Sequence, residues 1–224
     1  PAALDGVSAV YLFPVPDTVP DFLAAATRSG ARRVVALSSI ATQGEASGWR
    51  NVIGERHAVV ERAVERSGLE WTFLRPGAFA GNTLQWAPQI RGGGVVRAAY
   101  GDAATAPIHE RDIAAVAVRA LLDEGHAGAA YPLTGPESIT QRDQVQLIGE
   151  AIGENLVFTE LSREAAREAM IDNGAQAPIA DTLLDLFASL VGRPAEVVDT
   201  VVQVTGTPAR SFARWAAEHA DAFR

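Results

Sequence analysis

"GERHAVVERAVERSGLEWTFLRPGAF", residues 54–79, contains a helix, a tight turn and a buried strand in direct succession. Apolar residues recur at helical spacing up to Gly68, and glycine is a common residue just beyond a helix end. Residues 69–77 then form a short apolar run closed by Pro-Gly, which is typical of a strand buried on both faces. The predicted buried face of the helix consists of Val52, Val59, Val60 and Ala63.

Two similar apolar runs lie upstream of this stretch. Residues 6–16 and 31–39 are predicted strands, and the segment between them is a predicted helix with Pro20 near its start and Gly30 at its end. Three strands that alternate with two helices predict a parallel sheet with right-handed crossovers and helices on both faces.

Downstream of Asn82 the pattern is less regular. Thr140 is the predicted N-cap of a helix over residues 141–153. From Ser162 onward the sequence predicts three or four helices, of which the clearest, residues 207–223, has Thr207 as its N-cap. The other predicted elements are a strand within 92–102, a helix over 109–125, a strand within 129–140 and a strand within 155–161.

Charge and hydropathy exclude several kinds of partner. The formal net charge is -8 and the isoelectric point is about 5.0, so the chain repels a phosphate backbone and we expect no nucleic-acid partner. No apolar run approaches the ~20 residues that a membrane span requires. No signal peptide with leading basic residues opens the sequence, so we expect a soluble, cytoplasmic protein with no membrane partner.

The residue types that are absent exclude several kinds of chemistry. There is no cysteine, so there is no disulfide, thiolate ligand or cysteine nucleophile. There is no lysine, which excludes a phosphate-loop lysine, a Schiff base and the catalytic lysine of dehydrogenases. The four histidines have no metal-ligand spacing, so no metal is expected. His126 and His219 are expected at the surface, and His109 is expected in an exposed loop, with a position facing the pocket as the alternative.

Five segments resemble NmrA-like proteins, which are atypical short-chain dehydrogenase/reductases, in their order and spacing. These segments are "GVSAVYLFPVP", "RRVVALSS", "HAVVERAVERSGLEWTFLRPGAFAGN", "PIHERDIAAVAVRALL" and "YPLTGPESIT", and the final "GTPARSFARWAAEHADAF" is similar to the last helix of that family. The resemblance implies an α/β fold. Its Rossmann-like, doubly wound parallel sheet would bind NAD(P) and occupy residues 1–135. A small, mostly helical substrate lobe, residues 136–224, would be interleaved with it.

The resemblance also implies a function. The family includes NADPH-dependent reductases of quinones and other small molecules, and redox sensors that bind the dinucleotide and catalyse nothing detectable. We therefore expect an NAD(P)H-dependent reductase of a small apolar carbonyl or quinone-like substrate. The alternative is a non-catalytic NAD(P)-binding sensor that acts through a protein partner. The family favours NADP, although the sequence itself does not choose between NAD and NADP.

The sequence departs from the family by lacking the Gly-x-x-Gly-x-x-Gly loop that holds the cofactor pyrophosphate. Residues 6–16 resemble the fourth strand of the family, so we expect the sequence to begin within the domain and to represent its C-terminal part. The chain alone is expected to bind NAD(P) poorly. The strand at 6–16 is expected at an unpaired sheet edge, where a second copy, in a homodimer, is a candidate to cover it.

A second departure concerns the catalytic helix. The wider superfamily carries Tyr-x-x-x-Lys there, and alignment on Glu61 places Ile53 at the tyrosine position and His57 at the lysine position. Ile53 cannot transfer a proton. His57 is the tentative catalytic residue, as a proton donor or as a contact to the nicotinamide ribose. The alternative is that His57 is an ordinary half-buried helix residue.

The remaining candidate residues follow the strands, because open α/β sheets bind ligands at the carboxyl ends of their strands. The serines could instead cap turns, and the aromatic residues could instead belong to the core. The predicted cofactor contacts are Phe13, Pro14, Ser38, Ser39, His57, Pro76, Gly77, Ala78 and Phe79, and the predicted substrate contacts are Asn82 and Trp86.

Overall fold

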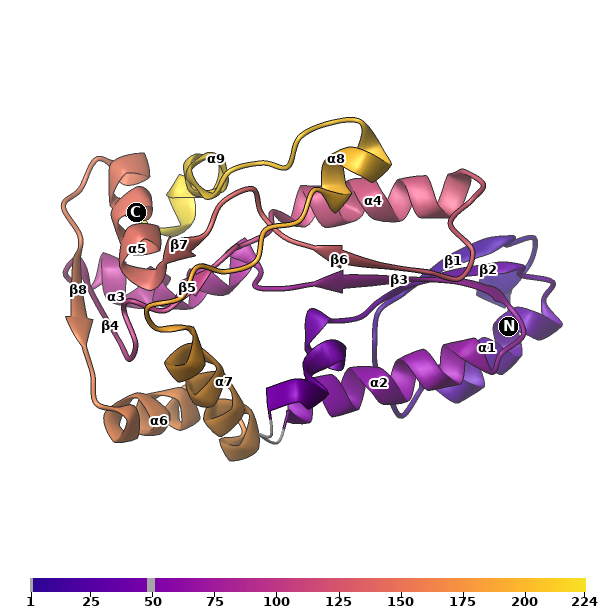
Figure 1. Ribbon diagram of the computed structural model, residues 1–224, viewed down its shortest axis with the longest axis horizontal. Helices are drawn as coiled ribbons and strands as arrows, with labels where there is room; N and C mark the ends of the chain where they lie inside the picture. Colours follow the sequence, from indigo (N-terminus) through magenta and orange to yellow (C-terminus); the bar gives the residue numbers. More distant parts are fainter. Residues whose placement is uncertain (1, 48–50) are drawn as a thin grey trace. The chain divides into compact units, whose positions relative to one another are not determined.

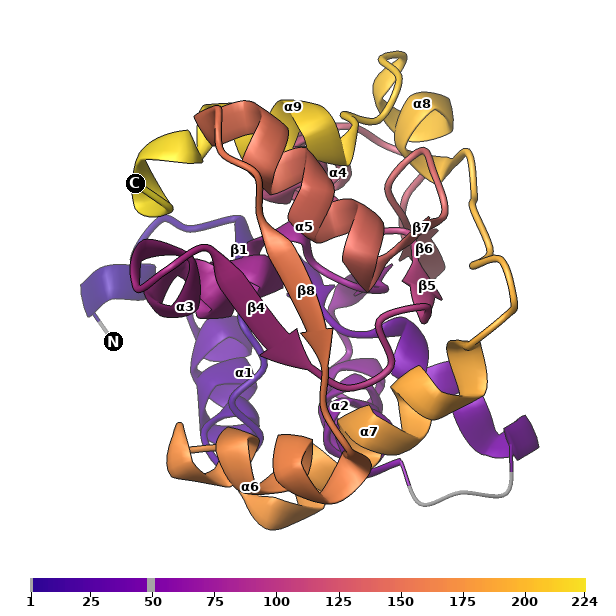
Figure 2. The same ribbon diagram turned by 90° about the vertical axis from the view of Figure 1, so that its left-hand side faces the viewer.

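The computed structural model describes residues 2–47 and 51–224 and divides the chain into two compact units (Figures 1 and 2). Each unit draws on three separate stretches of sequence. The first unit comprises Pro1–Gly77, Arg111–Leu133 and Thr200–Thr207. The second unit comprises Ala78–Glu110, Thr134–Asp199 and Pro208–Arg224.

A four-stranded parallel sheet forms the centre of the first unit. Its strands are β1 (Ala9–Leu12), β2 (Arg33–Leu37), β3 (Glu70–Pro76) and β6 (Ala129–Leu133), in the order β1-β2-β3-β6. Because all the strands run in the same direction, their carboxyl ends lie along one edge. The predicted α/β fold with a parallel, Rossmann-like sheet is confirmed.

Helices cover both faces of this sheet, with α1 and α2 on one face and α4 on the other (Figure 1). Val60 and Val64 of α2 pack with Val34 and Phe73 of the sheet. The bounds of the helical segments are η1 (Ala2–Leu4), α1 (Val19–Arg28), η2 (Ile40–Ser47), α2 (Val52–Glu65), α4 (Glu110–Leu122) and α8 (Thr200–Thr205).

The predicted ends of α1 and α2 are confirmed by the backbone. Gly30 has φ 88° and Gly68 has φ 77°, a left-handed conformation that glycine adopts without steric cost. Each glycine turns the chain from its helix into the next strand. The two βα units upstream of β3 therefore follow from the sequence pattern.

Strand β1 lies at an edge of the sheet, as the sequence predicts. Within the described residues, β1 pairs only with β2. Val10 and Leu12 are buried, whereas Tyr11, Phe13 and Val15 are exposed. The edge therefore presents alternate apolar side chains to solvent.

The second unit contains two small sheets and most of the C-terminal helices. Strands β4 (Val95–Ala98) and β8 (Val157–Glu160) are parallel and lie side by side, and β5 (Ala104–Thr105) pairs with β7 (Ile139–Thr140) in antiparallel fashion (Figure 2). The helical segments are η3 (Ala80–Trp86), α3 (Ala87–Arg91), α5 (Gln141–Ile152), α6 (Arg163–Asp172), α7 (Ala177–Leu190), α9 (Phe212–Glu218) and η4 (Ala220–Ala222).

The two predicted helix caps in this unit have different outcomes. Thr140 caps α5 as predicted, since its side chain accepts a hydrogen bond from the Asp143 N–H in a full capping box. The predicted start at Thr207 is wrong, because α9 begins at Phe212. Ser211 is the N-cap and accepts from the Arg214 N–H, while Glu137 accepts from the Phe212 N–H.

None of the described helices has the length and apolarity that crossing a bilayer requires.

Candidate functional site

The carboxyl edge of the first unit gathers most of the predicted cofactor contacts. Leu12 pairs with Ala36 in the strand register, and Leu37 pairs with Leu74, so the residues that follow these strands lie in adjacent rows. The predicted contacts at this edge are Phe13, Pro14, Ser38, Ser39, Pro76 and Gly77. Phe13 is 66% exposed there.

The two serines after β2 have different environments. Ser38 is buried, its N–H donates to the Leu74 carbonyl, and its hydroxyl donates to Glu61. Ser39 Oγ accepts from the Ala41 N–H at 3.2 Å, which shapes the start of η2. Ser39 thus caps a turn, which was the alternative role given for the serines. Cofactor contact by either serine stays a prediction.

The loop after β2 is held against the first turn of α2. Asn51 caps α2 by accepting from the Gly54 N–H at 2.9 Å, and its amide donates to the Ala41 carbonyl at 2.7 Å. A Cβ on Gly54 would lie 2.3 Å from the Ala41 oxygen. Only glycine therefore permits this approach of η2 to α2.

His57 lies in the first half of α2 and is partly buried. Its Nδ1 is 2.8 Å from the Ile53 carbonyl oxygen, one turn earlier. Because a carbonyl oxygen can only accept, Nδ1 carries the hydrogen. In the neutral ring Nε2 is then the acceptor nitrogen, and in the imidazolium it is a second donor.

One turn beyond His57, Glu61 is the centre of a buried network. Its Oε1 accepts from Ser38 Oγ at 2.6 Å and from Arg75 Nε at 2.8 Å, and its Oε2 accepts from Arg75 Nη2 at 2.7 Å. Glu61 is 6% exposed. The hydrogen bond to Glu61 raises the pKa of Arg75 above its ordinary value. We call Ser38, Glu61 and Arg75 the Glu61 clamp.

The buried face predicted for α2 is correct at Val60 and Ala63, which pack in the core, but it includes Val59 and omits Glu61. Val59 is 48% exposed, which corrects its predicted place on that face, and Glu61 is buried beside Val60 instead. The physical reason is the arginine on β3, which neutralises the carboxylate and allows its burial. The sequence did contain one indication that Glu61 is buried. Glu61 lies three residues before Val64, a spacing that places both on one face of the helix.

The other predicted contacts belong to the second unit. Ala78 and Phe79 are bound to the segment before α4, since the Ala78 carbonyl accepts from Ile108 N–H and Phe79 forms a bridge with Ile108. Asn82 is exposed, whereas Trp86 lies in the core of this unit. Trp86 therefore packs in the core, which was the alternative given for the aromatic residues. The roles of all four in binding stay predictions.

A second polar cluster surrounds His109, whose side chain is 1% exposed, so its expected position in an exposed loop is wrong. Its Nδ1 is 3.3 Å from Glu110 and its Nε2 is 3.3 Å from Glu218. His219 contacts Glu110 through Nε2 at 3.1 Å and the Trp215 carbonyl through Nδ1 at 2.8 Å. We call these residues the His109 cluster. Within the described part of the chain, no group of His, Asp or Glu side chains could hold a metal ion.

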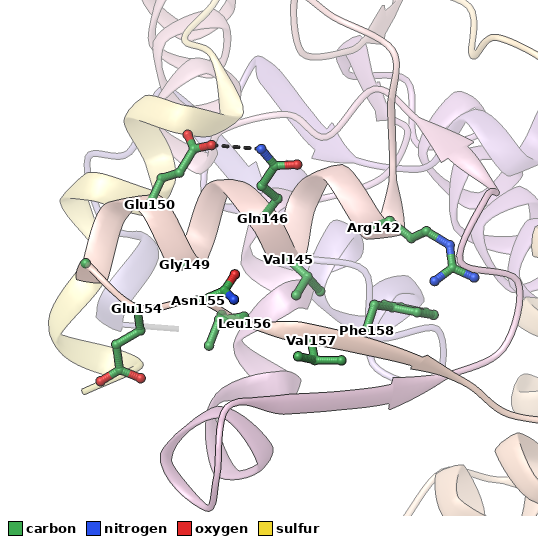
Figure 3. Close-up of a pocket in the computed structure, with 11 residues that line it drawn as sticks. Arg142, Val145, Gln146, Gly149, Glu150, Glu154, Asn155, Leu156, Val157 and Phe158 are labelled. Carbon is green, nitrogen blue, oxygen red and sulfur yellow. Dashed lines mark hydrogen bonds between the residues drawn. The ribbon is translucent and has the colours of Figure 1, made fainter.

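A groove of about 710 Å³ lies between α5 and β8 in the second unit (Figure 3). Gln146 donates to Glu150 at 3.0 Å on its helical side, and Arg142 lies over the ring of Phe158 at 4.8 Å. The groove is lined by Arg142, Val145, Gln146, Gly149, Glu150, Gly153, Glu154, Asn155, Leu156, Val157 and Phe158. None of the residues predicted to bind cofactor or substrate is among them.

A parallel sheet with helices on both faces and its strand ends at one edge is the doubly wound class of α/β protein, which binds ligands at that edge. Residues 2–124 match the family model described as NAD(P)H-binding. The chain belongs to this NAD(P)H-binding family, within the NmrA-like, atypical short-chain dehydrogenase/reductases, whose cofactor is a nicotinamide dinucleotide.

The curated relatives include two enzymes that match essentially the whole chain. One is a (4-alkanoyl-5-oxo-2,5-dihydrofuran-3-yl)methyl phosphate reductase of Streptomyces griseus, which is 46% identical over 99% of this chain and 79% of its own length. Another is an NAD(P)H azoreductase of Xenophilus azovorans, which is 37% identical over 100% of this chain and 79% of its own.

Among solved structures, an NADPH-dependent quinone oxidoreductase from Escherichia coli, in complex with NADPH, is similar to this chain with a TM-score of 0.79. The two share 25% sequence identity over 97% of this chain and 78% of the other.

Proposed function

We propose that this chain is an NADPH-dependent reductase of a small, apolar carbonyl or quinone-like substrate. The observation that carries the proposal is the 46% identity to a reductase across 99% of this chain. The azoreductase and the quinone oxidoreductase support the same reaction class, since both names couple a nicotinamide cofactor to reduction. NADPH is chosen over NADH because the solved quinone oxidoreductase binds NADPH.

The carboxyl edge of the first unit suits the nicotinamide half of such a cofactor. Phe13 presents an exposed aromatic ring at this edge, and Gly77 brings no side chain to it. As the alternative to the proton-donor role assigned below, the neutral ring of His57 would accept from a ribose hydroxyl through Nε2. When bound, the cofactor supplies a hydride.

Reduction of a carbonyl also requires a proton for the oxygen. We assign this proton to His57, because the imidazolium can donate from Nε2 while Nδ1–H remains bonded to the Ile53 carbonyl. Ile53 occupies the tyrosine position of the superfamily and has no proton to give. Asn82 and Trp86 stay the proposed substrate contacts, and Ala78 and Phe79 stay proposed cofactor contacts.

The names of the relatives narrow the substrate class. A 4-alkanoyl-5-oxo-2,5-dihydrofuran has a carbon–carbon double bond conjugated with two carbonyl groups, and a quinone has conjugated carbonyls. Both are electrophiles that accept a hydride at one end of a conjugated system and a proton at the other. We propose a substrate of this conjugated carbonyl type.

The test is NADPH oxidation by the product of the full-length gene, followed by loss of NADPH absorbance. The panel contains a benzoquinone, an acylated butenolide and a saturated ketone of similar size. We expect turnover of the first two, and a loss of kcat on the order of 100-fold in His57→Gln. His126→Gln is the matched control, because His126 bonds Tyr131 and lies outside the proposed site.

The absence of lysine and the isoleucine at position 53 favour a second function, a non-catalytic NAD(P)-binding sensor. Tight NADPH binding by calorimetry, without oxidation by any member of the panel, would establish that alternative instead. Absence of NADPH and NADH binding would contradict both.

A further inference from the structure

The Glu61 clamp joins three elements at the carboxyl edge of the first unit. Ser38 follows β2, Glu61 lies on α2, and Arg75 lies on β3. Leu37 pairs with Leu74 in the register, so Ser38 and Arg75 come next in the same row of the sheet. The carboxylate of Glu61 therefore bridges the ends of two adjacent strands to one helix.

Each member of the clamp is a proposed cofactor contact or lies close to one. Ser38 is itself a proposed contact and precedes Ser39, and Arg75 precedes Pro76. Glu61 lies four residues after His57, and side chains at this spacing share one helix face. The network is thus located where all three elements supply the proposed site.

Stability alone does not account for such a network. Desolvation of a buried ion pair offsets much of its attraction, and apolar residues of similar volume often stabilise a fold equally well. Arg75 nevertheless binds both oxygens of Glu61 through two different nitrogens, at 2.8 and 2.7 Å. A two-point bond of this kind fixes direction as well as distance.

We propose that Glu61 is a positioning residue that fixes the rotation and axial position of α2 against β2 and β3, and thereby holds His57 Nε2 at the carboxyl edge. The effect passes through the backbone of α2, because His57 is bonded to Ile53 within the same helix. This inference rests on the proposed function. Its consequence is that loss of the clamp impairs the reaction even where the fold is intact.

The main test is the double variant Glu61→Gln/Arg75→Gln in the full-length protein, which leaves no unpaired charge. We expect a thermal midpoint close to that of the wild type, a kcat lower on the order of 10- to 100-fold, and a weaker affinity for NADPH. The matched control is Glu70→Gln, which removes the exposed carboxylate paired with Arg33 at the amino end of β3. It should leave kcat unchanged.

Two milder variants keep the proposal testable if the double variant does not fold. Arg75→Lys retains the charge but loses the two-point bond, and Ser38→Ala removes one of the three hydrogen bonds. Folded variants whose kcat and NADPH affinity stay within about twofold of wild type would overturn the proposal. If the wild type binds NADPH without turnover, the proposed function fails, while NADPH affinity still tests the clamp.

Discussion

The Glu61 clamp and the His109 cluster both join carboxylates to nitrogen-bearing side chains, but only the clamp buries its carboxylate, since the Glu110 side chain is about half exposed. Arg75 is charged at every pH that a protein experiences. His109 has carboxylate oxygens at both ring nitrogens, and His219 has a carboxylate at one and a carbonyl at the other.

The comparison shows two ways in which polar side chains hold elements together. The clamp concentrates its hydrogen bonds on one buried carboxylate, whereas the cluster distributes its contacts over two histidines and two more exposed carboxylates. In the His109 cluster, Glu110 also accepts from Trp215 Nε1 at 2.9 Å, and Arg214 donates to Glu218 at 2.8 Å. This cluster therefore attaches α9 to the start of α4.

The largest effect is expected from Arg75→Ala, because it leaves the Glu61 carboxylate buried without its cation. Removal of one partner of a buried pair costs about 3–5 kcal/mol of unfolding free energy. Urea unfolding at pH 7 measures this loss. Glu61→Met/Arg75→Met should cost much less, and an equal loss in both variants would contradict the role of the unpaired charge.

An intermediate effect is expected from His109→Ala on the attachment of α9. The substitution removes the buried imidazole that contacts both Glu110 and Glu218. Amide hydrogen exchange in α9 should show lower protection in the variant than in the wild type. Protection of β2 and β3 should not change, and equal changes in both regions would break the comparison.

A smaller effect is expected from Glu70→Gln. Glu70 is about half exposed and pairs with Arg33, whose guanidinium also donates to carbonyls at the end of α4. Exposed pairs contribute about 0–1 kcal/mol, so the unfolding free energy should fall by less than ~1 kcal/mol. A loss as large as that of Arg75→Ala would remove the distinction between the two ends of β3.

The smallest effect is expected from the exposed pair between α6 and α7. The hydrogen bond from Arg167 lowers the pKa of Asp181 below its ordinary value. A lowered carboxylate pKa contributes stability that is present above the unfolded value and is lost as pH falls through the folded value. Asp181→Asn should abolish this small loss of unfolding free energy at acid pH, and added salt should reduce the loss in the wild type.

Regular patterns predicted the scaffold of the first unit well. The apolar runs of β2 and β3, and the glycines at positions 30 and 68, define the βα units through local spacing alone. The common edge at which Ser38 and Gly77 lie follows from parallel topology. These features depend on neighbours in sequence, which is why the sequence reveals them.

The charged interior could not be predicted in the same way. Burial of Glu61 depends on Arg75 and Ser38, and burial of His109 depends on Glu218, which is 109 residues away. A hydropathy pattern assigns such residues to the surface because it contains no information about distant partners. The start of α9 at Phe212 was missed since Glu137 binds that N–H from outside the local sequence.

The approach of η2 to α2 limits how the sequence can vary over time. Position 54 must lack a side chain, because the Ala41 oxygen occupies the space of a Cβ. Position 41 contributes only its carbonyl to this contact, and every amino acid offers the same carbonyl. Among descendants of this gene, position 54 should therefore remain glycine, whereas position 41 should accept many different residues.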